Sequence, residues 1–484
     1  MVWISSSNSK KRSMKKFIFT IATIATLASC KKSELDLGPF DQIETGKAFT
    51  TQADVTLAVN GMYSGLRGTY ANSTWNIMAD ALADNLILST SGRQTLTNFS
   101  EWRYNGNTTI SFLTSAYGVI RRANAILENI DKFPAGAFKD NAKAEALAVR
   151  AWQYFDIARY HAKTYVNATN TDSVAPYVTS TASDIMPSKE PVRQFYDKIA
   201  ADLVAAEPMI GVNNGAGRIN RAAVQGLLSR LYLYMGDYAK TITSANAALG
   251  TTPVLPAMAD VARVWRDETT NGVLFKVLNT TLDNINTPGV NFYQITSGNI
   301  RSEYVVEYNL RQAFTPTDVR TAAYITTSPY NGVQQNHVTK YAGRTGGILG
   351  VLDIKLLRTA EVLLNRAEAY LRSGNATAAL ADLNLLRSQR YTDYQPLVGL
   401  TDDQVLTEIL RQRRLELAFE GDRFFDLKRL NLPINRDGTR GDRADGTGTT
   451  YLFLNMANTD HRFQLPYPSA ETNFNTNFKQ NPGY

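Results

Sequence analysis

Residues 415–429 read LELAFEGDRFFDLKR, and this stretch is the most informative in the chain. It mixes ionisable side chains with apolar ones that normally fill a core. Just upstream, three leucines and one arginine recur at spacings of four, three and four: Leu406, Leu410, Arg413 and Leu417. This periodicity predicts a helix whose apolar face carries the guanidinium of Arg413. A charge in such a position needs an ionic partner.

Acidic residues near Arg413 in the chain are the expected partners of its charge. Glu416 follows it by three residues, which places both side chains on the same side of a helix, and Asp422 or Asp426 are further candidates. Gly421 is expected to end this helix in a left-handed conformation. Because paired charges beside a core are commonly structural, the sequence predicts an ion-pair network rather than a catalytic centre. Its predicted members are Arg413, Glu416, Glu420, Asp422 and Asp426.

The longer stretch RQRRLELAFEGDRFFDLKR, residues 411–429, resembles the C-terminal signature of the SusD/RagB family. Residues 354–390, with LLRTAEVLLNRAEAYLRSGN and ALADLNLLRSQR, and residues 463–484 are similar to further family segments, as are residues 117–130 and 144–160. The resemblance implies a SusD-like helical fold and a non-catalytic, nutrient-binding lipoprotein of the outer membrane. It also implies capture of oligosaccharides, or of peptides in the RagB branch, and delivery to a SusC-like TonB-dependent transporter.

The first residues have the pattern of a bacterial export signal. Lys15 and Lys16 precede an apolar run, residues 17–27, which is too short to span a bilayer as a helix. Small residues then lead to Cys30, the arrangement of a lipoprotein cleavage site. We therefore expect residues 1–29 to be an export signal translated from Met14, and residues 30–48 to be a tether that carries lipid on Cys30.

The composition argues against several kinds of site. Cys30 is the only cysteine, so the folded part has no disulfide and no thiol nucleophile. His161, His337 and His461 lie far apart and form no metal-ligand spacing, so we expect neither a metal site nor a cofactor. The formal charge is +7, but five cations and no acid precede Cys30, which leaves +2 on the rest of the chain. This balance gives no support to nucleic-acid binding.

Helical periodicity dominates residues 49–250 and 351–430, which predicts a mainly α scaffold. Two helical hairpins with turns at Gly236-Asp237 and Gly374-Asn375 resemble tetratricopeptide hairpins, although the turns lie too far apart for a tandem array. Residues 251–350 lack this period and predict loops with a few short strands. Residues 431–484 are expected to form C-terminal loops and a tail, so that residues 49–484 make a single SusD-like unit.

Residues 435–450 are predicted to be a flexible loop because they are polar and rich in glycine. The run DGTRGDRADGTG within them invites a calcium interpretation, but it lacks the carboxylate spacing of an EF-hand loop. Whether calcium binds there stays open.

Aromatic and amide side chains on loop-like sequence are the candidates for ligand binding. Sugars present flat C–H faces to aromatic rings and hydroxyl groups to polar side chains. The resemblance implies site positions in the run ADN, residues 83–85, and in residues 102–105, whereas the central loops supply further candidates without an aligned motif. The predicted ligand-binding residues are Asp84, Asn85, Trp102, Tyr104, Asn105, Tyr293, Arg301 and Tyr330.

Two other functions stay open on sequence alone. A tetratricopeptide-like interaction scaffold would use the helical hairpins and bind no nutrient. A glycoside hydrolase would use Glu416 and Glu420, although two carboxylates on one helix amid arginines suit an ion-pair cluster better than a pair that flanks a scissile bond. Lipid anchorage at the outer membrane, facing the cell surface, is expected. Lys31 and Lys32 nevertheless depart from the acidic pattern after the lipidated cysteine of surface-exposed family members, so outward or periplasmic orientation stays open.

Overall fold

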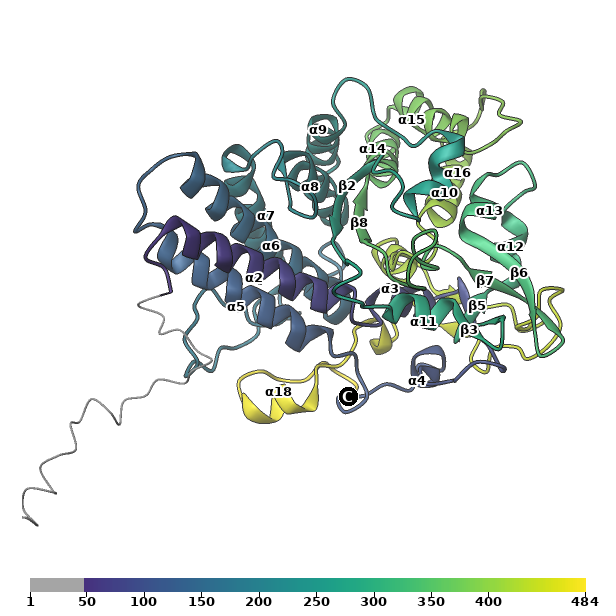
Figure 1. The fold of residues 1–484 in the computed structure, drawn as a ribbon, viewed down its shortest axis with the longest axis horizontal. Coiled ribbons are helices and arrows are strands. Elements are labelled where there is room, and N and C mark those ends of the chain that lie inside the picture. Colours follow the sequence, from purple (N-terminus) through teal and green to yellow (C-terminus); the bar gives the residue numbers. More distant parts are fainter. Residues whose placement is uncertain (1–47) are drawn as a thin grey trace, which may run out of the picture. The chain divides into compact units, whose positions relative to one another are not determined.

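The computed structural model describes residues 48–484, so the predicted export signal, the lipidation site Cys30 and residues 30–47 of the tether lie outside the described range. Residues Val55–Tyr484 form one compact unit. Helices supply most of its regular structure, and its strands are short (Figure 1). The predicted mainly α class is confirmed. None of the helices within residues 48–484 is both long enough and apolar enough to cross a membrane.

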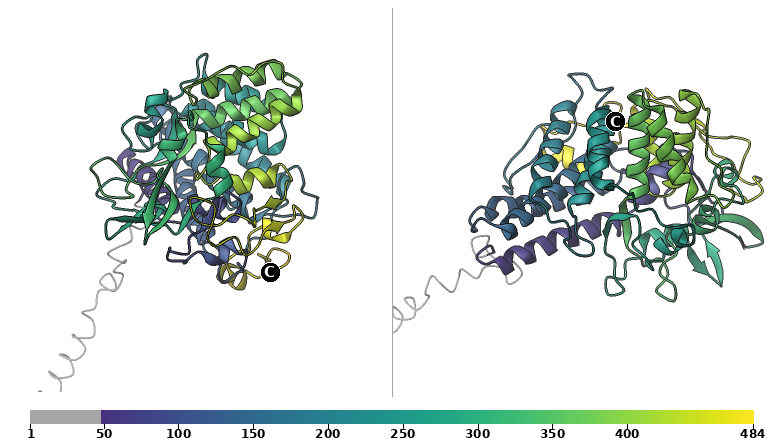
Figure 2. Two further views of the ribbon diagram at one scale, coloured as in Figure 1. Left: turned by 90° about the vertical axis from the view of Figure 1, so that its right-hand side faces the viewer. Right: turned by 90° about the horizontal axis from the view of Figure 1, so that it is seen from above.

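Long helices form the scaffold. They are α2 (Gln52–Tyr70), α5 (Phe112–Ile130), α6 (Ala137–His161), α7 (Val192–Met209), α8 (Arg221–Met235), α9 (Tyr238–Leu249), α14 (Thr359–Arg372), α15 (Ala376–Ser388) and α16 (Asp402–Glu416). Seen from above (Figure 2), helices α5 to α9 and helices α14 to α16 stand as two groups, and α9 packs against α14.

Shorter helices connect and cover these groups. They are α3 (Trp75–Leu82), α4 (Thr97–Ser100), α10 (Val261–Val264), α11 (Thr287–Phe292), α12 (Tyr308–Ala313), α13 (Arg320–Tyr324), α17 (Arg423–Arg429) and α18 (Ser469–Phe474), with 3-10 turns η2 (Met258–Asp260) and η3 (His461–Phe463).

The turns of the two predicted helical hairpins form where the sequence places them. Gly236 ends α8 with a φ of +74°, and the side chain of Asp237 accepts the Lys240 N–H to start α9. Gly374 follows α14 with a φ of +79°, and the side chain of Asn375 caps α15 in the same way. A left-handed glycine followed by a capping side chain reverses the chain within two residues, so each pair of helices packs as a hairpin.

In the described part of the chain, the strands form five two-stranded antiparallel sheets. The pairs are β1 (Leu86–Leu88) with β5 (Tyr304–Val306), β2 (Val273–Val277) with β8 (Ile354–Arg358), β3 (Gln294–Thr296) with β4 (Asn299–Arg301), β6 (Ile325–Tyr330) with β7 (Val333–Val338), and β9 (Ile434–Asn435) with β10 (Asn455–Met456).

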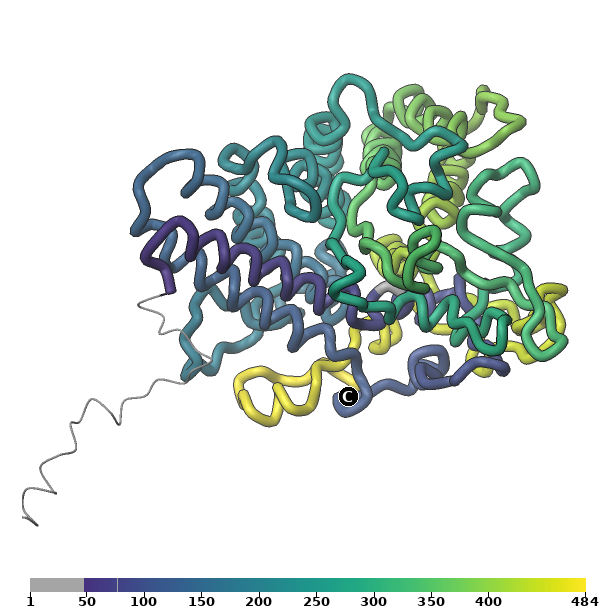
Figure 3. Tube along the Cα trace, viewed as in Figure 1, coloured from purple at the N-terminus to yellow at the C-terminus, as the bar shows by residue number. Residues whose placement is uncertain are grey.

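Residues 431–484 run back across the unit instead of forming a separate layer. The Leu465 N–H donates to the carbonyl of Tyr160 at 2.9 Å, and the Asn481 side chain donates to the carbonyl of His161 at 2.6 Å, which ties the tail to the end of α6. An earlier part of the same segment lies beside the β6–β7 hairpin (Figure 3). The C-terminal residues therefore join the helical scaffold to the loop-rich region.

Candidate ligand-binding site

Two β-hairpins project from the loop-rich region. Ser297 and Gly298 join β3 to β4 with φ of +50° and +78°, and Asn331 and Gly332 join β6 to β7 with the same two values. Two successive left-handed residues make a turn of type I′, whose twist matches that of the paired strands. Asn-Gly is the dipeptide that favours this turn most strongly, so the sequence already contains the signal for the second hairpin.

The two hairpins meet through Arg301 and Tyr330. The Arg301 guanidinium donates from Nε to the Ser91 carbonyl at 3.1 Å and from Nη2 to the Gly92 carbonyl at 3.0 Å. The central carbon of the guanidinium, Cζ, lies 5.9 Å from the centre of the Tyr330 ring, within the range of a cation–π contact. We call the surface formed by residues 89–96, residues 293–303 and the side of the β6–β7 hairpin that carries Tyr330 the hairpin face.

The loop of residues 89–96 is fastened to β7 and β4. Gln335 donates from Nε2 to Ser89 Oγ at 2.9 Å and accepts the hydroxyl of Ser91 at 3.0 Å. A Cβ on Gly92 would lie 2.6 Å from the carbonyl oxygen of Ser302, so only glycine allows this close approach. The carbonyls that orient Arg301 are therefore held in place by buried contacts.

Arg93 is a second cation at the hairpin face that the sequence analysis missed. It donates to Asn291 Oδ1 at 3.1 Å and lies 3.4 Å from Glu303 Oε2. Glu303 also accepts the Leu96 N–H at 3.2 Å, which holds the end of the same loop. No local motif identifies Arg93, because its partners come from α11 and the residues before β5.

Residues 435–450 pack against the hairpin face. The buried carboxylate of Asp442 accepts the Thr90 N–H at 2.9 Å and its hydroxyl at 2.7 Å, and the Ala444 N–H donates to the Gln334 carbonyl at 2.9 Å. These bonds fix a segment that the sequence predicts to be a flexible loop, which corrects that prediction. The partners of Asp442 and Ala444 lie far away in the sequence, so local composition could not reveal them.

The hairpin face presents the groups that sugar recognition requires. Tyr293, Arg301 and Tyr330 are half-buried, whereas Asn299 at the start of β4 and Asn331 in the β6–β7 turn are exposed. Within residues 48–484, Arg301 forms no ion pair, and its bonds to carbonyls leave guanidinium donors for another acceptor. A tyrosine ring beside a guanidinium and exposed amides can receive both the C–H face and the hydroxyl rim of a sugar.

A cavity of about 460 Å³ lies on the other side of the β6–β7 hairpin. Its walls include Arg311, Phe314, Thr327 and Asn336. Side chains alternate along a strand, so Thr327 and Tyr330 point to opposite faces of β6. The hairpin therefore separates two surfaces, and a ligand could use either.

Asp84 and Asn85 are occupied by arginines instead of facing a ligand, which corrects their predicted role. Asp84 accepts two hydrogen bonds from Arg423, at 2.7 and 2.8 Å, and lies 3.4 Å from Arg414. Burial alone would raise the pKa of Asp84, but Arg414 and Arg423 outweigh it and hold the pKa below its usual range. Asn85 is fully buried, accepts from Arg414 at 2.8 Å and donates to Asp80 at 2.6 Å.

Trp102 is also an interior residue, because only 3% of it is exposed. Its indole N–H donates to the carbonyl of Leu82 at 2.8 Å, and the guanidinium of Arg436 lies 4.1 Å from the centre of its ring. Arg436 in turn donates to the carbonyls of Ala81 and Leu82 at the end of α3. Because its N–H is hydrogen-bonded and its ring is covered by Arg436, Trp102 packs in the interior. This corrects the prediction that it stacks on a ligand.

Tyr104 and Asn105 lie in a segment bound to the C-terminal tail. Tyr104 is buried and donates to the Arg462 carbonyl at 2.6 Å, so its predicted contact with a ligand is also corrected. Asn105 is exposed, but its side-chain oxygen accepts the Asn107 N–H at 2.9 Å and closes a turn. Of the eight predicted positions, only Tyr293, Arg301 and Tyr330 fall within the hairpin face, and of these Arg301 and Tyr330 contact each other.

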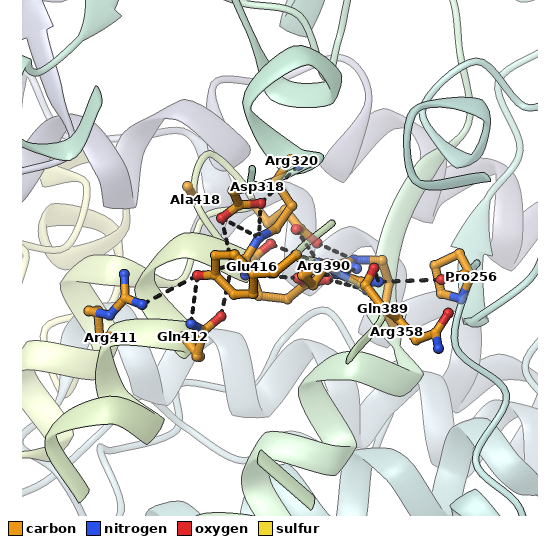
Figure 4. Close-up of polar contacts among 12 residues, drawn as sticks. Pro256, Asp318, Arg320, Arg358, Gln389, Arg390, Arg411, Gln412, Glu416 and Ala418 are labelled. Carbon is orange, nitrogen blue, oxygen red and sulfur yellow. Dashed lines mark hydrogen bonds and ion pairs between the residues drawn. The ribbon is translucent and has the colours of Figure 1, made fainter. Parts of the chain in front are cut away.

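The ion-pair cluster around Glu416 is buried in the scaffold (Figure 4). Glu416 accepts from Arg390 at 2.9 and 3.0 Å, from Arg358 at 2.8 Å and from Arg320 at 3.3 Å. Burial alone would raise the pKa of Glu416, but Arg390 and Arg358 outweigh it and hold the pKa well below its usual range. The carboxylate is therefore a permanent anion that joins three arginines.

Glu420 extends the same cluster. It accepts from Arg358 at 2.5 and 2.8 Å and from the ammonium of Lys340 at 2.7 Å. The space beside Glu420 measures only about 20 Å³, which is enough for a water molecule and far too small for a sugar ring. Neither this residue nor Glu416 has room for a glycosidic bond.

Arg413 finds its partners beyond its own helix. It lies 2.9 Å from Asp426 and 3.2 Å from Asp422, the two further candidates that the sequence offered. Glu416 pairs with other arginines instead, so the predicted pairing of Arg413 with Glu416 is wrong. Helix α16 ends at Glu416, five residues before Gly421, which corrects the predicted cap. Gly421 does adopt a φ of +76°, but in the turn that leads to α17.

The described residues contain no group of three or more His, Cys, Asp or Glu side chains arranged to hold a metal ion. The carboxylates of Glu416, Glu420, Asp422 and Asp426 are instead paired with arginine and lysine.

The fold is a helical-hairpin scaffold that carries one face of loops and short β-hairpins. The model of the SusD family matches residues 153–484, and a second family model, described as starch-binding and associating with the outer membrane, matches residues 35–233. The chain therefore belongs to the SusD family, which confirms the family predicted from its sequence motifs.

Related proteins cover nearly the whole chain. SusD-like protein P2 from Formosa agariphila is 27% identical over 97% of this chain and 100% of its own length. The structure of a SusD superfamily protein from Bacteroides vulgatus has a TM-score of 0.79 at 25% identity and covers 90% of this chain and 100% of that one. A SusD-like carbohydrate binding protein from Bacteroides vulgatus has a TM-score of 0.76 at 20% identity, covering 89% and 98%, a likeness of fold.

Proposed function

We propose that this protein binds nutrient oligosaccharides at the cell surface without altering them and delivers them to a SusC-like TonB-dependent transporter. The protein would be held at the outer membrane by lipid on Cys30. The hairpin face would be the binding surface, with Tyr330 packing against a sugar ring and Arg301 donating to its hydroxyl groups. The observation that carries the proposal is the Arg301–Tyr330 pair, held by buried contacts on one side and half-open on the other.

The comparisons support the choice of ligand class. One matched family model is described as starch-binding and associating with the outer membrane, and one structural relative is described as a carbohydrate binding protein. Peptide binding, which the RagB branch of the family would imply, is the alternative. The aromatic ring and exposed amides of the hairpin face favour sugars. The Glu303 carboxylate at this face is buried and lies 3.4 Å from Arg93, so it is not presented to the amino group of a peptide.

The absence of catalysis is proposed from the state of the acidic residues. The two carboxylates that a hydrolase would use, Glu416 and Glu420, are buried and hydrogen-bonded to cations. A general acid needs a raised pKa and a nucleophile needs access to the sugar, and the Glu416 cluster offers neither.

Calorimetric titration of the protein with a panel of oligosaccharides and peptides tests the proposal. We expect saturable heat with at least one oligosaccharide and no sugar product after prolonged incubation. Binding of peptides alone would favour the RagB-like alternative, and release of product would overturn the non-catalytic assignment. Co-purification of a TonB-dependent transporter with the native protein would test delivery separately.

Three variants locate the site on one side of the β6–β7 hairpin. Tyr330→Ala removes the ring at the hairpin face, and Gln312→Trp fills the mouth of the 460 Å³ cavity on the other side. Tyr370→Ala is a matched control, because Tyr370 is also half-buried and also lies 5.9 Å from an arginine, Arg366, but on the helical scaffold. The proposal predicts lost affinity in Tyr330→Ala alone. Loss in Gln312→Trp alone would place the ligand in the cavity.

A further inference from the structure

A second cavity, of about 260 Å³, lies where the ends of α6 and α17 meet the segment before and within η3. The polar residues that line it include Asn167, Asn431, Asn458 and Gln464, and Phe463 is an aromatic lining residue. The ring of Phe463 is fixed by stacking on Phe424 at a centroid distance of 5.2 Å. The cavity is separate in sequence and in lining residues from the hairpin face.

Lys428 lines this cavity and is an unusual buried cation. Only 9% of the residue is exposed, and its ammonium donates to the Arg159 carbonyl at 2.7 Å, near the C-terminal end of α6. An ammonium has three donors, so this bond leaves two for other acceptors. Among the residues that the structure describes, no carboxylate lies within ion-pair distance of Lys428.

The other charged residues of the cavity wall are already paired. Lys163 lies 2.8 Å from Asp172, and Asp460 accepts hydrogen bonds from Arg462 at 2.6 and 2.9 Å. Asp460 therefore does not neutralise Lys428. The buried cations of the Glu416 cluster have carboxylate partners. Lys428 has none among residues 48–484 and lines an open cavity, so its ammonium can pair with an anion that enters from outside the chain.

We propose that this cavity is a second binding site, and that it takes the carboxylate of an acidic sugar such as a hexuronic acid. The carboxylate would accept the free donors of Lys428, the ring would lie against Phe463, and its hydroxyl groups would meet the surrounding amides. The cavity is smaller than the range of about 300–1,000 Å³ typical of pockets for larger ligands, so it suits one sugar ring.

The electrostatics of Lys428 support this choice over a neutral sugar. Burial, reinforced by the nearby cation of Arg159, lowers the pKa of Lys428 to about 7. A carboxylate brought next to the ammonium would offset that penalty, whereas a sugar hydroxyl would not. The site thus discriminates by charge, and the surrounding amides add preference for a hydroxyl-rich molecule over a simple anion.

Titration calorimetry of the full-length protein in detergent with glucuronate, galacturonate, glucose and acetate tests the inference. We expect one of the two uronates to bind at millimolar concentration or better, and to bind more tightly than glucose and acetate. Equal binding of glucose would overturn the role of the charge, and equal binding of acetate would overturn the role of the sugar ring. Absence of heat with both uronates would overturn the site itself.

Variants connect the binding to this cavity. Lys428→Met should weaken uronate binding at least about tenfold, which equals about 1.4 kcal/mol. Thr459→Trp, at an exposed position of the rim, should block the cavity without changing its charge. Lys479→Met removes an exposed lysine elsewhere and should bind as the native protein does.

Unchanged uronate binding in both Lys428→Met and Thr459→Trp would refute the assignment. Tyr330→Ala should leave uronate binding intact, so that failure of this second site is distinguishable from failure of the proposed function of the hairpin face.

Discussion

The Glu416 cluster and the hairpin face contain the same pair of side chains in two settings. In the cluster, Arg320 lies 5.5 Å from the ring of Tyr391, is fully buried, and is paired with Asp318 and Glu416. At the hairpin face, Arg301 lies 5.9 Å from the ring of Tyr330, is half-buried, and bonds only to carbonyls. An arginine beside a tyrosine is structural where carboxylates use its donors and is suited to recognition where they stay available.

We expect the largest change in the free energy of unfolding from a substitution in the Glu416 cluster. Glu416→Gln removes the anion that joins three buried arginines, and the free energy of unfolding should fall by about 3–5 kcal/mol. Chemical denaturation with a fixed m-value would measure it. Glu101→Gln is the control, because Glu101 pairs with the exposed Arg103 and should cost at most about 1 kcal/mol. Similar losses in the two variants would show that the buried pairing is not what stabilises the fold.

Trp102 should behave as a member of the core. Trp102→Ala removes a buried ring that covers Arg436 and should cost about 3 kcal/mol of unfolding free energy. Trp102→Phe keeps a ring in place and should preserve ligand affinity, measured by calorimetry. A large loss of affinity in Trp102→Phe at unchanged stability would restore Trp102 to the binding site.

Lys428 sharpens the comparison because it is a buried cation without a carboxylate. Its folded-state pKa of about 7 lies below its ordinary value of 10.5, so its contribution to stability is lost as the pH falls from about 10 towards 7. Methionine carries no charge, so Lys428→Met lacks this pH dependence. The free energy of unfolding of the variant, relative to that of the native protein, should be about 2 kcal/mol higher at pH 6 than at pH 9. Unfolding curves of both proteins at the two pH values would test this, and a pH-independent difference would contradict it.

The smallest effect on the fold is expected at the hairpin face. Tyr330→Ala should change the free energy of unfolding by less than about 1 kcal/mol, because the ring is half-exposed. The same variant should weaken oligosaccharide binding at least about tenfold, or about 1.4 kcal/mol. A thermal melt and a titration on one preparation give both values. A lower melting temperature with unchanged ligand affinity would show that Tyr330 stabilises the fold and does not bind the ligand.

Local sequence signals predicted the helical scaffold well. The turns at Gly236 and Gly374 follow from a left-handed glycine and a capping side chain, and both lie within two residues of the helices they separate. The sequence predicts that α16 ends at Gly421, because a glycine commonly caps a helix, but the helix ends at Glu416. Glu416 pairs with Arg358 and Arg390, which lie on other elements. Pairing over long sequence distances decided that boundary.

The ligand-binding site was predictable only in part. Arg301 and Tyr330 were identifiable as polar and aromatic residues in a region of loops and turns, and the Asn-Gly dipeptide marks the turn beside Tyr330. Asp84 and Trp102 were misassigned, because Arg423 and Arg436, which occupy them, lie far along the chain. A single sequence does not reveal such contacts, so burial could not be separated from exposure.

The crystal structure of the protein with a bound oligosaccharide, chosen from the calorimetric panel, would test the hairpin face most directly. We expect a sugar ring against Tyr330 and a hydroxyl group within hydrogen-bond distance of the Arg301 guanidinium, with the Glu416 cluster unchanged. A sugar bound at Trp102, or inserted among the arginines around Glu416, would contradict the division between a structural charged core and a recognition surface.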